Sequence, residues 1–429
     1  MILEFKVENY LSFREEQILS FEPSSDKEYA SHYLVEVKKG VSVLKLGLLY
    51  GANASGKTNI LKSLEFLRKF VLQQKSDKTK KTGVLSFQFD ESCIRKPSKF
   101  ELSFYLNKIK YVYSVTINRN KVLEENLIYY PSTQPAIFFE RKFDSKNEKS
   151  LVKFGGTINL KASDRKIIQG LTISNSSVFS AFSKANIDKS MLDDVFNWFN
   201  DDFMQIIKPS TDLFGWTTEK VEEDKVCKDF VLDVLKQADF NISSIDIEEE
   251  EIEIDKDIES KISRMDIPHE VKTKLLAKKI LKAKDISFQH TTSLMKKNLP
   301  QSLESSGTLR YYGLGGVLNK LLSSNTFLCI DEIENSLHYD LVAHFIKTFL
   351  MNSKNSQLLF STHDINLLNE DFLRRDTVWF LDKNEFGASE LYSLLDFKLH
   401  KNLSPYNAYK IGKLGAKPNL GEIIISNHG

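Results

Sequence analysis

The stretch GLLYGANASGKTNIL, residues 47–61, contains the motif G-x-x-x-x-G-K-[ST] from Gly51 to Thr58. A short apolar run ends at Tyr50 and a helically periodic segment begins at Thr58, which is the strand-and-helix context of a phosphate-binding loop. Glycine at Gly51 and Gly56 lets backbone N–H groups surround phosphates without a Cβ in the way, and the helix directs its positive end at them. The stretch predicts an α/β fold that binds a nucleoside triphosphate.

Two polar residues that end the motif have separate expected roles. Lys57 supplies a positive charge for the β- and γ-phosphates. The hydroxyl of Thr58 can bind Mg²⁺. We therefore expect ATP and Mg²⁺ as the ligands of this loop.

Composition limits the class of protein. At 429 residues the chain suggests two lobes, or one domain with a large insertion. The net charge of +1 does not point to a nucleic-acid partner, although it leaves a local basic patch open. Cys93, Cys227 and Cys329 are too few and too far apart for a disulfide framework or a metal site. A charged start without a signal peptide and the absence of a long apolar run predict a cytoplasmic protein with no membrane contact.

The chain divides by pattern into three parts. Alternating residues predict a strand over 2–8 and an antiparallel β-subdomain over 84–156. Residues 162–283 have mainly helical spacing, including a Lys-rich helix from Val271 to Leu281. We predict an N-terminal lobe at 1–160 with the phosphate loop and β-subdomain, a mainly helical insertion (an arm or lid) at 161–284, and a C-terminal lobe at 285–429.

Within the insertion, isoleucines alternate with acidic residues from Ile245 to Asp255. A strand with one solvated acidic face explains this pattern better than a metal site or a mimic of DNA. Carboxylates without a turn-forming loop are weak evidence for Ca²⁺.

Two apolar strands in the C-terminal lobe end in candidate catalytic residues. Residues 327–330 lead into Asp331 and Glu332, and residues 357–360 lead into a segment that contains His363. An acid at the carboxyl end of a strand beside a phosphate loop is placed to serve Mg²⁺, so Asp331 is the expected metal residue. Glu332 is placed to polarise the attacking water, and His363 to sense the γ-phosphate.

The segment LESSGTLR, residues 303–310, precedes a helix that leads to the Asp-Glu strand. Ser305 and Gly307 at a helix start form a second candidate anion site, because the first N–H groups of a helix have no internal partner.

In order along the chain, GANASGKTN, ESSGT, CIDEIENSLH and LLFSTHD resemble the phosphate loop, signature, Asp-Glu segment and switch histidine of ABC-type ATPase heads in the RecF, SMC and OLD group. Asn53 and Asn59 are typical of this group rather than of transporter ATPases. The signature departs from the family pattern at Glu304 and Thr308.

The resemblance is nearest to bacterial AAA-type ATPases of the abortive-infection AbiLi / RloA-like class. It rests also on RDTVWF at 375–380 and YKIGKLGAKP at 409–418, and it covers the chain to about residue 418. It implies an ABC-type P-loop head with an antiparallel β-subdomain and a helical insertion. It also implies an ATP-driven sensor or regulator in anti-phage defence, acting with a separately encoded effector.

In such heads the nucleotide lies between the phosphate loop of one subunit and the signature of another, which implies a homodimer or higher homo-oligomer through the heads. A glutamine near the β-subdomain is expected beside the metal, and Gln88 is the nearest candidate. Two alternatives stay open: a RecF-like repair ATPase that binds DNA, and a scaffold that binds ATP without turning it over. Too little chain follows His363 for the nuclease domain of OLD proteins.

Overall fold

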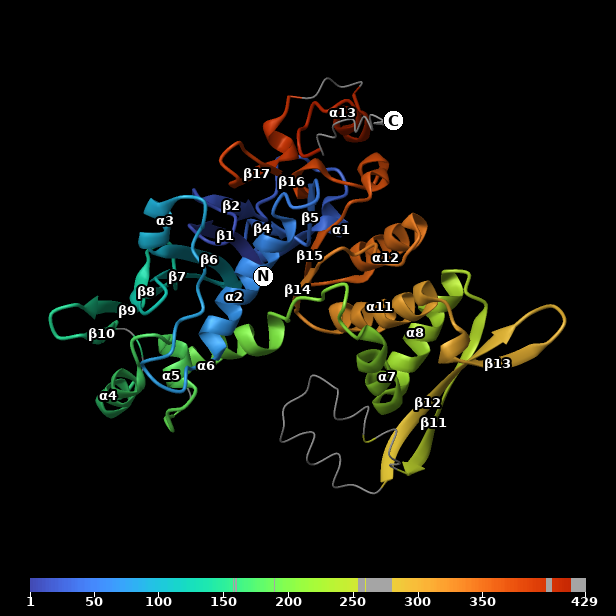
Figure 1. Ribbon diagram of the computed structural model, residues 1–429, viewed down its shortest axis with the longest axis horizontal. Coiled ribbons are helices and arrows are strands. Elements are labelled where there is room, and N and C mark those ends of the chain that lie inside the picture. The colour runs from blue at the N-terminus through green and yellow to red at the C-terminus, as the bar shows by residue number, and fades with distance from the viewer. Residues whose placement is uncertain are drawn as a thin grey trace, which may run out of the picture. The chain divides into compact units, whose positions relative to one another are not determined.

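The computed structural model describes residues 1–156, 158, 160–188, 190–253, 259, 280–398 and 403–417. The chain forms two compact units (Figure 1). The first unit comprises Met1–Thr211, Lys320–Asn335 and Phe345–Gly429, and the second comprises Asp212–Asn319 and Ser336–His344. Two helices, α11 (Ser306–Ser323) and α12 (Tyr339–Asn352), continue from one unit into the other.

A five-stranded sheet in the first unit carries the phosphate loop. Its order is β14-β15-β5-β16-β17, with bounds Phe327–Ile330, Gln357–Ser361, Leu46–Gly51, Val378–Lys383 and Ser389–Ser393. The first four strands are parallel and β17 is antiparallel to β16. Every residue of β5 is buried, because parallel strands flank it on both sides, and its sequence is accordingly a continuous apolar run. The carboxyl ends of four strands therefore meet at one edge of the sheet.

Helix α2, Lys57–Leu72, follows the phosphate loop. The apolar residues at helical spacing (Ile60, Leu61, Leu64, Leu67 and Phe70) are all buried, as their periodicity predicts. Gly56 precedes the helix with a φ of 117°, a backbone conformation that a side chain would strain.

A seven-stranded antiparallel sheet forms the β-subdomain of the first unit, and the predicted α/β head with such a subdomain is confirmed. Its order is β10-β9-β8-β7-β6-β1-β2, with bounds Lys149–Phe154, Ala136–Asp144, Val122–Tyr130, Ile109–Ile117, Ser98–Leu106, Ile2–Glu8 and Gln17–Ser20. Strand β1 pairs with both β2 and β6, so the N-terminal strand belongs to this sheet. Residues 84–90, expected to begin the β-rich part, form no strand and precede the short helix α3, Glu91–Arg95.

Smaller elements complete the first unit. A hairpin joins β3 (Leu34–Lys38) to β4 (Val41–Leu44) after the single turn of α1 (Ala30–Tyr33). Near the C-terminus, α13 (Pro405–Lys410) leads into a turn in which the hydroxyl of Tyr409 donates to the carbonyl oxygen of Ala416 at 2.8 Å.

Residues 162–211 also belong to the first unit, although the sequence assigned them to an insertion that began at residue 161. Their elements are α4 (Ala162–Leu171), α5 (Val178–Phe182), α6 (Met191–Asn197) and a π-helical turn (Trp198–Asp202). Aromatic packing explains the difference: Trp198 stacks on Phe104 of β6 with ring centroids 4.2 Å apart. These helices therefore cover the β-subdomain, and the second unit begins only at Asp212.

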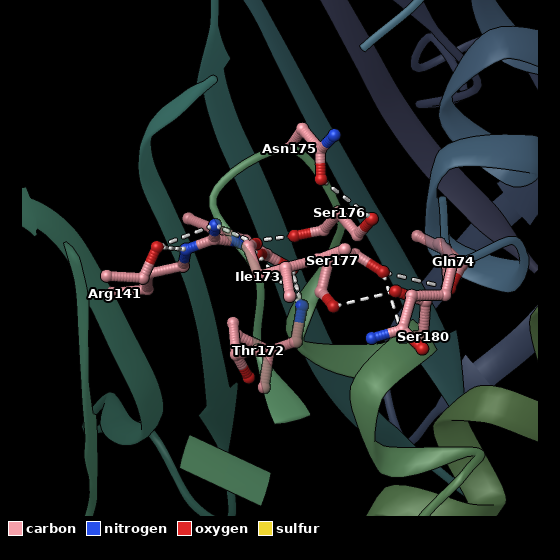
Figure 2. Close-up of polar contacts among 12 residues, drawn as sticks. Gln74, Arg141, Thr172, Ile173, Asn175, Ser176, Ser177 and Ser180 are labelled. Atoms are coloured by element: carbon pink, nitrogen blue, oxygen red, sulfur yellow. Dashed lines mark hydrogen bonds and ion pairs between the residues drawn. The ribbon is translucent and has the colours of Figure 1, made fainter. Parts of the chain in front are cut away.

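A buried ion pair joins strands β8 and β9. Its arginine, Arg141, also contacts Ile173 and Ser176 in the loop that precedes α5 (Figure 2). Arg141 donates to a carboxylate oxygen of Glu125 at 2.9 Å, and both side chains are completely buried. The remaining donors of Arg141 reach the hydroxyl of Ser150 and the carbonyl oxygens of Ile173 and Ser176. We name Glu125, Arg141 and these partners the buried pair cluster.

The second unit combines helices with a three-stranded antiparallel sheet. Helices α7 (Leu213–Glu223) and α8 (Lys225–Gln237) precede β11 (Ile242–Glu253), β12 (Ile280–Thr291) and β13 (Lys296–Pro300), in the order β11-β12-β13. The acidic segment is a strand as far as Glu253, as predicted, and residues 254–255 lie outside the described residues. The helix expected from Val271 to Leu281 lies outside the described residues up to 279, and Ile280 and Leu281 begin β12 instead. The unit is therefore mixed rather than mainly helical.

Candidate functional site

The phosphate loop leaves β5 at Gly51 and enters α2 after Gly56. A Cβ at Gly51 would lie 2.5 Å from the carbonyl oxygen of Leu381 and would also collide with the side chain of Ser55. A Cβ at Gly56 would meet the side chain of Ser389, 2.8 Å from its Cβ. Close contact, as well as the positive φ of Gly56, thus requires glycine at both ends of the loop.

Lys57 lies buried under the loop it belongs to. Its ammonium donates to the carbonyl oxygens of Gly51 at 2.8 Å and Ala52 at 3.1 Å. Burial lowers the pKa of Lys57, and the nearby carboxylates of Asp331 and Glu332 act in the opposite direction. Within the described part of the chain, no carboxylate lies at ion-pair distance from this ammonium, so its charge is available to a ligand.

The structure brings Thr58 and Asp331 together. The hydroxyl of Thr58 donates to Oδ1 of Asp331 at 3.2 Å, and the buried hydroxyl of Ser361 donates to the same oxygen at 2.6 Å. A hydroxyl and a carboxylate, both oxygen ligands, suit Mg²⁺, which usually takes only one or two protein groups and completes its shell with water and phosphate. The donor set therefore fits the ion, with Thr58 and Asp331 as its protein residues. The described residues contain no cluster of three or more His, Cys, Asp or Glu side chains suited to a metal.

Glu332 and His363 also come together, with Oε1 and Nε2 3.9 Å apart. Their side chains are 45% and 36% exposed. Glu332 has a φ of 50°, and its backbone N–H donates to Ser361 at 2.8 Å. A left-handed conformation at a residue other than glycine costs roughly 1–3 kcal/mol and is concentrated at functional sites. Ser361 thus holds both the carboxylate of Asp331 and the strained backbone of Glu332.

Glu334 ties the Asp-Glu segment to the histidine segment. Its Oε1 accepts the backbone N–H of His363 at 2.6 Å, while its Oε2 is buried and has no hydrogen-bond partner among the described residues. The motif search on the sequence gave Glu334 no role. Its place within the Asp-Glu segment CIDEIENSLH, two residues after Glu332, was the available signal.

A cavity of about 490 Å³ opens over the loop and contains most of the expected residues. Its walls are residues 53–59, Glu332, His363 and Lys383. Lys383 ends β16, in which Leu381 pairs with Gly51, so the strand order places a second lysine beside the loop. Sequence reasoning missed Lys383 because no motif marks it and the neighbour of β5 was not known.

Asn59 and the N-terminal turn support the loop from its other side. The amide nitrogen of Asn59 donates to the hydroxyl of Ser12 at 2.8 Å, and Ser389 donates to the same hydroxyl at 2.8 Å. Both asparagines line the loop cavity. They differ in that Asn59 also makes this supporting contact with Ser12.

Ser305 and Gly307 belong to the second unit, at the start of α11. The hydroxyl of Ser305 accepts the backbone N–H of Thr308 at 3.0 Å, which caps the helix. A Cβ at Gly307 would lie 3.0 Å from the carbonyl oxygen of Ser336 in the same unit. The expected helix start is present, and the contacts of these two residues with a nucleotide stay a prediction.

The structure does not bring Gln88 to the loop cavity. Its side chain is exposed and donates to the carbonyl oxygen of Ser86 at 2.7 Å, and it lines a separate cavity with Asn118 and Arg119. Because residues 84–90 form no strand, the backbone does not direct Gln88 toward Thr58 and Asp331. Gln88 is thus not supported as a metal residue.

A family described as "AAA domain, putative AbiEii toxin, Type IV TA system" matches residues 48–369. The chain belongs to this AAA domain family. The match contains the phosphate loop, the helix start at Ser305 and Gly307, the Asp-Glu segment and His363. A search of curated proteins found no match. Among the described residues, no helix of this AAA domain protein has the length and apolar character needed to cross a membrane.

Solved structures similar to this AAA domain protein include heads of SMC proteins. An SMC head domain from Thermotoga maritima is 13% identical, with a TM-score of 0.42 and coverage of 91% of this chain and 98% of that one. An SMC head bound to the C-terminal winged-helix domain of ScpA is 11% identical, with a TM-score of 0.44 and coverage of 91% and 97%. An SMC head with an extended coiled coil, bound to the C-terminal domain of ScpA derived from Pyrococcus furiosus, is 10% identical, with a TM-score of 0.42 and coverage of 97% and 99%.

Proposed function

We propose that this AAA domain protein binds ATP with Mg²⁺ in the loop cavity and hydrolyses the γ-phosphate. The observation that carries the proposal is one hydrogen-bonded row beside Lys57: Thr58 to Asp331 at 3.2 Å, Ser361 to Asp331 at 2.6 Å, and the Glu332 backbone to Ser361 at 2.8 Å. This row supports the proposal because it joins the residues proposed for metal binding, Thr58 and Asp331, to the residue proposed to activate water, Glu332.

Lys57 is the residue that meets the β- and γ-phosphates. Among the described residues, its ammonium donates only to neutral carbonyl oxygens of the loop. Phosphate oxygens are stronger acceptors because they are charged, so they replace the carbonyls when the nucleotide enters. When bound, Mg²⁺ supplies neutralisation of the charge on the β- and γ-oxygens. Thr58 and Asp331 are the residues that would hold it, directly or through water.

Glu332 and His363 act on the γ-phosphate side of the cavity. Glu332 accepts a proton of the attacking water and orients its lone pair, and His363 donates to an outer γ-phosphate oxygen. Glu332 thus combines proton transfer with positioning of the water, and His363 stabilises charge; positioning and charge stabilisation supply most of the rate gain in phosphoryl transfer. The left-handed backbone of Glu332 keeps its carboxylate at the cavity wall.

We further propose that the second half of the site comes from another copy of the chain, through Ser305 and Gly307. A γ-phosphate held from one side leaves oxygens in solvent, and charge that develops there in the transition state needs a second set of donors. The capped start of α11 offers such N–H groups. ATP would then drive head-to-head pairing into a homodimer or higher homo-oligomer.

The proposed biological role is a cytoplasmic ATP-driven sensor or regulator in anti-phage defence, acting with a separately encoded effector. Support comes from the family, whose description names AbiEii and type IV toxin–antitoxin systems.

The experiment measures multiple-turnover phosphate release by the full chain, with Mg²⁺ and with EDTA. Glu332→Gln should keep ATP affinity and lose about 10²–10⁴-fold in turnover, the range for a group that acts on proton transfer. Glu385→Gln, an exposed acid outside the cavity lining, is the control and should be unchanged. A normal rate in EDTA or in Glu332→Gln contradicts the proposal.

A further inference from the structure

The segment at the start of α11 departs from the signature of ABC-type heads at two residues, Glu304 and Thr308. The structure gives each of them a partner in the second unit. The hydroxyl of Thr308 lies 2.9 Å from the hydroxyl of Ser305. Oε1 of Glu304 lies 2.6 Å from Nε2 of His290, which belongs to β12. The proposed function gives no role to either Glu304 or His290.

The contact between Glu304 and His290 lies mostly out of solvent. A carboxylate oxygen accepts hydrogen bonds, so Nε2 of the histidine carries the proton and donates it. The side chain of Glu304 is 5% exposed and that of His290 is 24% exposed. Among the described residues, no lysine or arginine lies within ion-pair distance of Glu304. The buried carboxylate therefore depends on this histidine, in contrast to an ion pair in solvent, which contributes little to stability.

The three-stranded sheet fixes the position of His290. β12 is the middle strand, and the Cα partners of His290 are Ile242 on β11 and Lys297 on β13. Side chains two residues apart along a strand share a face. Phe288 therefore lies on the face of His290; it is fully buried and packs edge-on against Tyr312 of α11, with ring centroids 5.4 Å apart. This face of β12 thus contacts both α11 and the residue that precedes its cap.

Glu304 comes directly before the residue that caps α11. The hydroxyl of this cap, Ser305, accepts the N–H of Thr308 at 3.0 Å, and its carbonyl oxygen accepts the N–H of Leu309 at 3.1 Å. The N–H groups proposed for the γ-phosphate belong to this first turn. Donors stabilise a transition state most when they are oriented before the reaction. A contact that fixes Glu304 therefore also fixes the direction of these donors.

We propose that His290 and Glu304 are a positioning pair for the start of α11, through which the three-stranded sheet orients the donors offered to the γ-phosphate of another copy. This role rests on the proposed function. The pair contacts neither nucleotide nor metal and acts through Ser305 and Gly307. It also accounts for the departure from the family signature at Glu304, because a leucine there could not accept a hydrogen bond from the histidine.

Hydrogen exchange of the free full chain tests the positioning without nucleotide. Glu304→Ala removes the acceptor and leaves a partly exposed histidine that water can solvate, so the chain should stay folded. The amides of Thr308 and Leu309 should then exchange about tenfold faster, because the first turn of α11 opens more often. Glu304→Gln keeps an oxygen that accepts from His290, so its exchange should match the wild type. Unchanged exchange in Glu304→Ala, or the same increase in Glu304→Gln, overturns the proposal.

Phosphate release and ATP calorimetry give a second readout. Glu304→Ala should keep the ATP affinity of a single head, whose phosphate loop is unchanged, and lose about 10²-fold in turnover, the cost of a misplacement of roughly 1 Å. Glu304→Gln should recover most of the turnover. Glu223→Ala breaks an exposed ion pair with Lys220 on α7 of the same unit, and as the control it should be unchanged. Normal turnover in Glu304→Ala overturns the proposal.

Mixing shows which copy the pair serves. In a two-fold dimer, equal amounts of Glu304→Ala and Lys57→Ala chains give mixed pairs in which one intact phosphate loop meets one intact start of α11, so about a quarter of normal turnover should return. No recovery, with co-assembly demonstrated, means that Glu304 serves its own chain and overturns the proposal. A wild-type chain that hydrolyses no ATP contradicts the proposed function instead, and the exchange measurement, which contains no ATP, still decides the positioning.

Discussion

Two charged clusters of the first unit, the buried pair cluster and the phosphate-loop site, satisfy their polar groups to different degrees. In the buried pair cluster, Glu125 and Arg141 are 0% exposed, and every described donor and acceptor has a partner within the protein. Around the phosphate loop, Glu332 is 45% exposed, and the buried polar atoms Tyr50 Oη, Ser55 Oγ and Glu334 Oε2 have no partner among the described residues.

The comparison shows two uses of charged groups: in the buried pair cluster they stabilise the fold, and in the phosphate-loop site they are available to a ligand. A buried charge is tolerated only when it is paired and fully hydrogen-bonded, so the buried pair cluster has nothing left to offer a second molecule. In the phosphate-loop site some donors and acceptors have no partner within the described protein, which lowers stability but leaves them free to bind a ligand. Substitutions in the two clusters should accordingly change different measurements.

The largest effect is expected from Arg141→Ala. It leaves the carboxylate of Glu125 buried without its cation, and breaking a buried pair in this way typically costs about 3–5 kcal/mol. Chemical denaturation should show this loss in the free energy of unfolding, while the protein that stays folded should bind ATP normally.

A double variant sharpens the same prediction. Arg141→Met with Glu125→Leu removes both charges together and should be far less destabilising than Arg141→Ala, because no unpaired charge remains. If the double variant is at least as unstable as the single one, then the hydrogen bonds of Arg141 to Ser150 and Ile173, rather than the charge, hold the cluster.

The next largest effect is expected at Gly307, which we propose completes the phosphate-loop site of another copy of the chain. Gly307→Asp should repel the γ-phosphate and lower turnover by about 10²–10³-fold, the loss typical of one transition-state donor, with nucleotide binding by a single head kept. Gly307→Ala is the control for crowding, because any side chain at this position comes within 3.0 Å of the Ser336 carbonyl oxygen. The loss of turnover in Gly307→Ala should be much smaller than the loss in Gly307→Asp.

Mixing tests whether Gly307 acts on another copy. In a two-fold dimer, equal amounts of Lys57→Ala and Gly307→Asp chains give mixed pairs with one intact site, so about a quarter of normal activity should return. No recovery at any ratio, with co-assembly demonstrated, would mean that both halves of the site lie in one chain.

The fold was predictable where one pattern dominated. The continuous apolar run of β5 and the alternation from Ile2 to Glu8 each predict a strand, and both strands are present. Strand order and the unit boundary were not predictable. Trp198 stacks on Phe104, a contact between residues 94 positions apart, and helical spacing alone cannot reveal such packing.

The site was predictable to the extent that motifs mark it. The spacing of Lys57, Thr58, Asp331, Glu332 and His363 identified residues that the structure does bring together around one cavity or its hydrogen-bonded support. Lys383 carries no motif. Its place depends on the pairing of β16 with β5, which is a tertiary fact.

Lys57→Ala should affect binding and leave stability nearly unchanged. Hydrogen bonds to a charged group contribute about 1.5–3 kcal/mol each, so the affinity for ATP should fall at least tenfold. The free energy of unfolding should hardly change, since the ammonium serves only two carbonyl oxygens of its own loop. Lys62→Ala, an exposed lysine on the same helix, is the matched control in calorimetry. Unchanged affinity in Lys57→Ala would refute the loop assignment.

The smallest effect is expected at Ser361. This residue belongs to the phosphate-loop site, yet its side chain is buried and fully hydrogen-bonded, as in the buried pair cluster. Its hydroxyl donates to Asp331 and accepts from the backbone of Glu332, so Ser361→Ala leaves the part-buried N–H of Glu332 without this partner and should cost about 1–3 kcal/mol of stability. Ser353→Ala is the control, because the Ser353 hydroxyl is buried without a partner in the described chain and its removal should cost nothing. Since Ser361 also orients the carboxylate of Asp331, Mn²⁺ binding followed by electron paramagnetic resonance should weaken several-fold in Ser361→Ala and not in Ser353→Ala. Loss of stability with unchanged Mn²⁺ affinity would mean that Ser361 stabilises the fold but does not orient Asp331 for a metal. Loss of both would mean that this one hydroxyl serves the fold and the metal residue together.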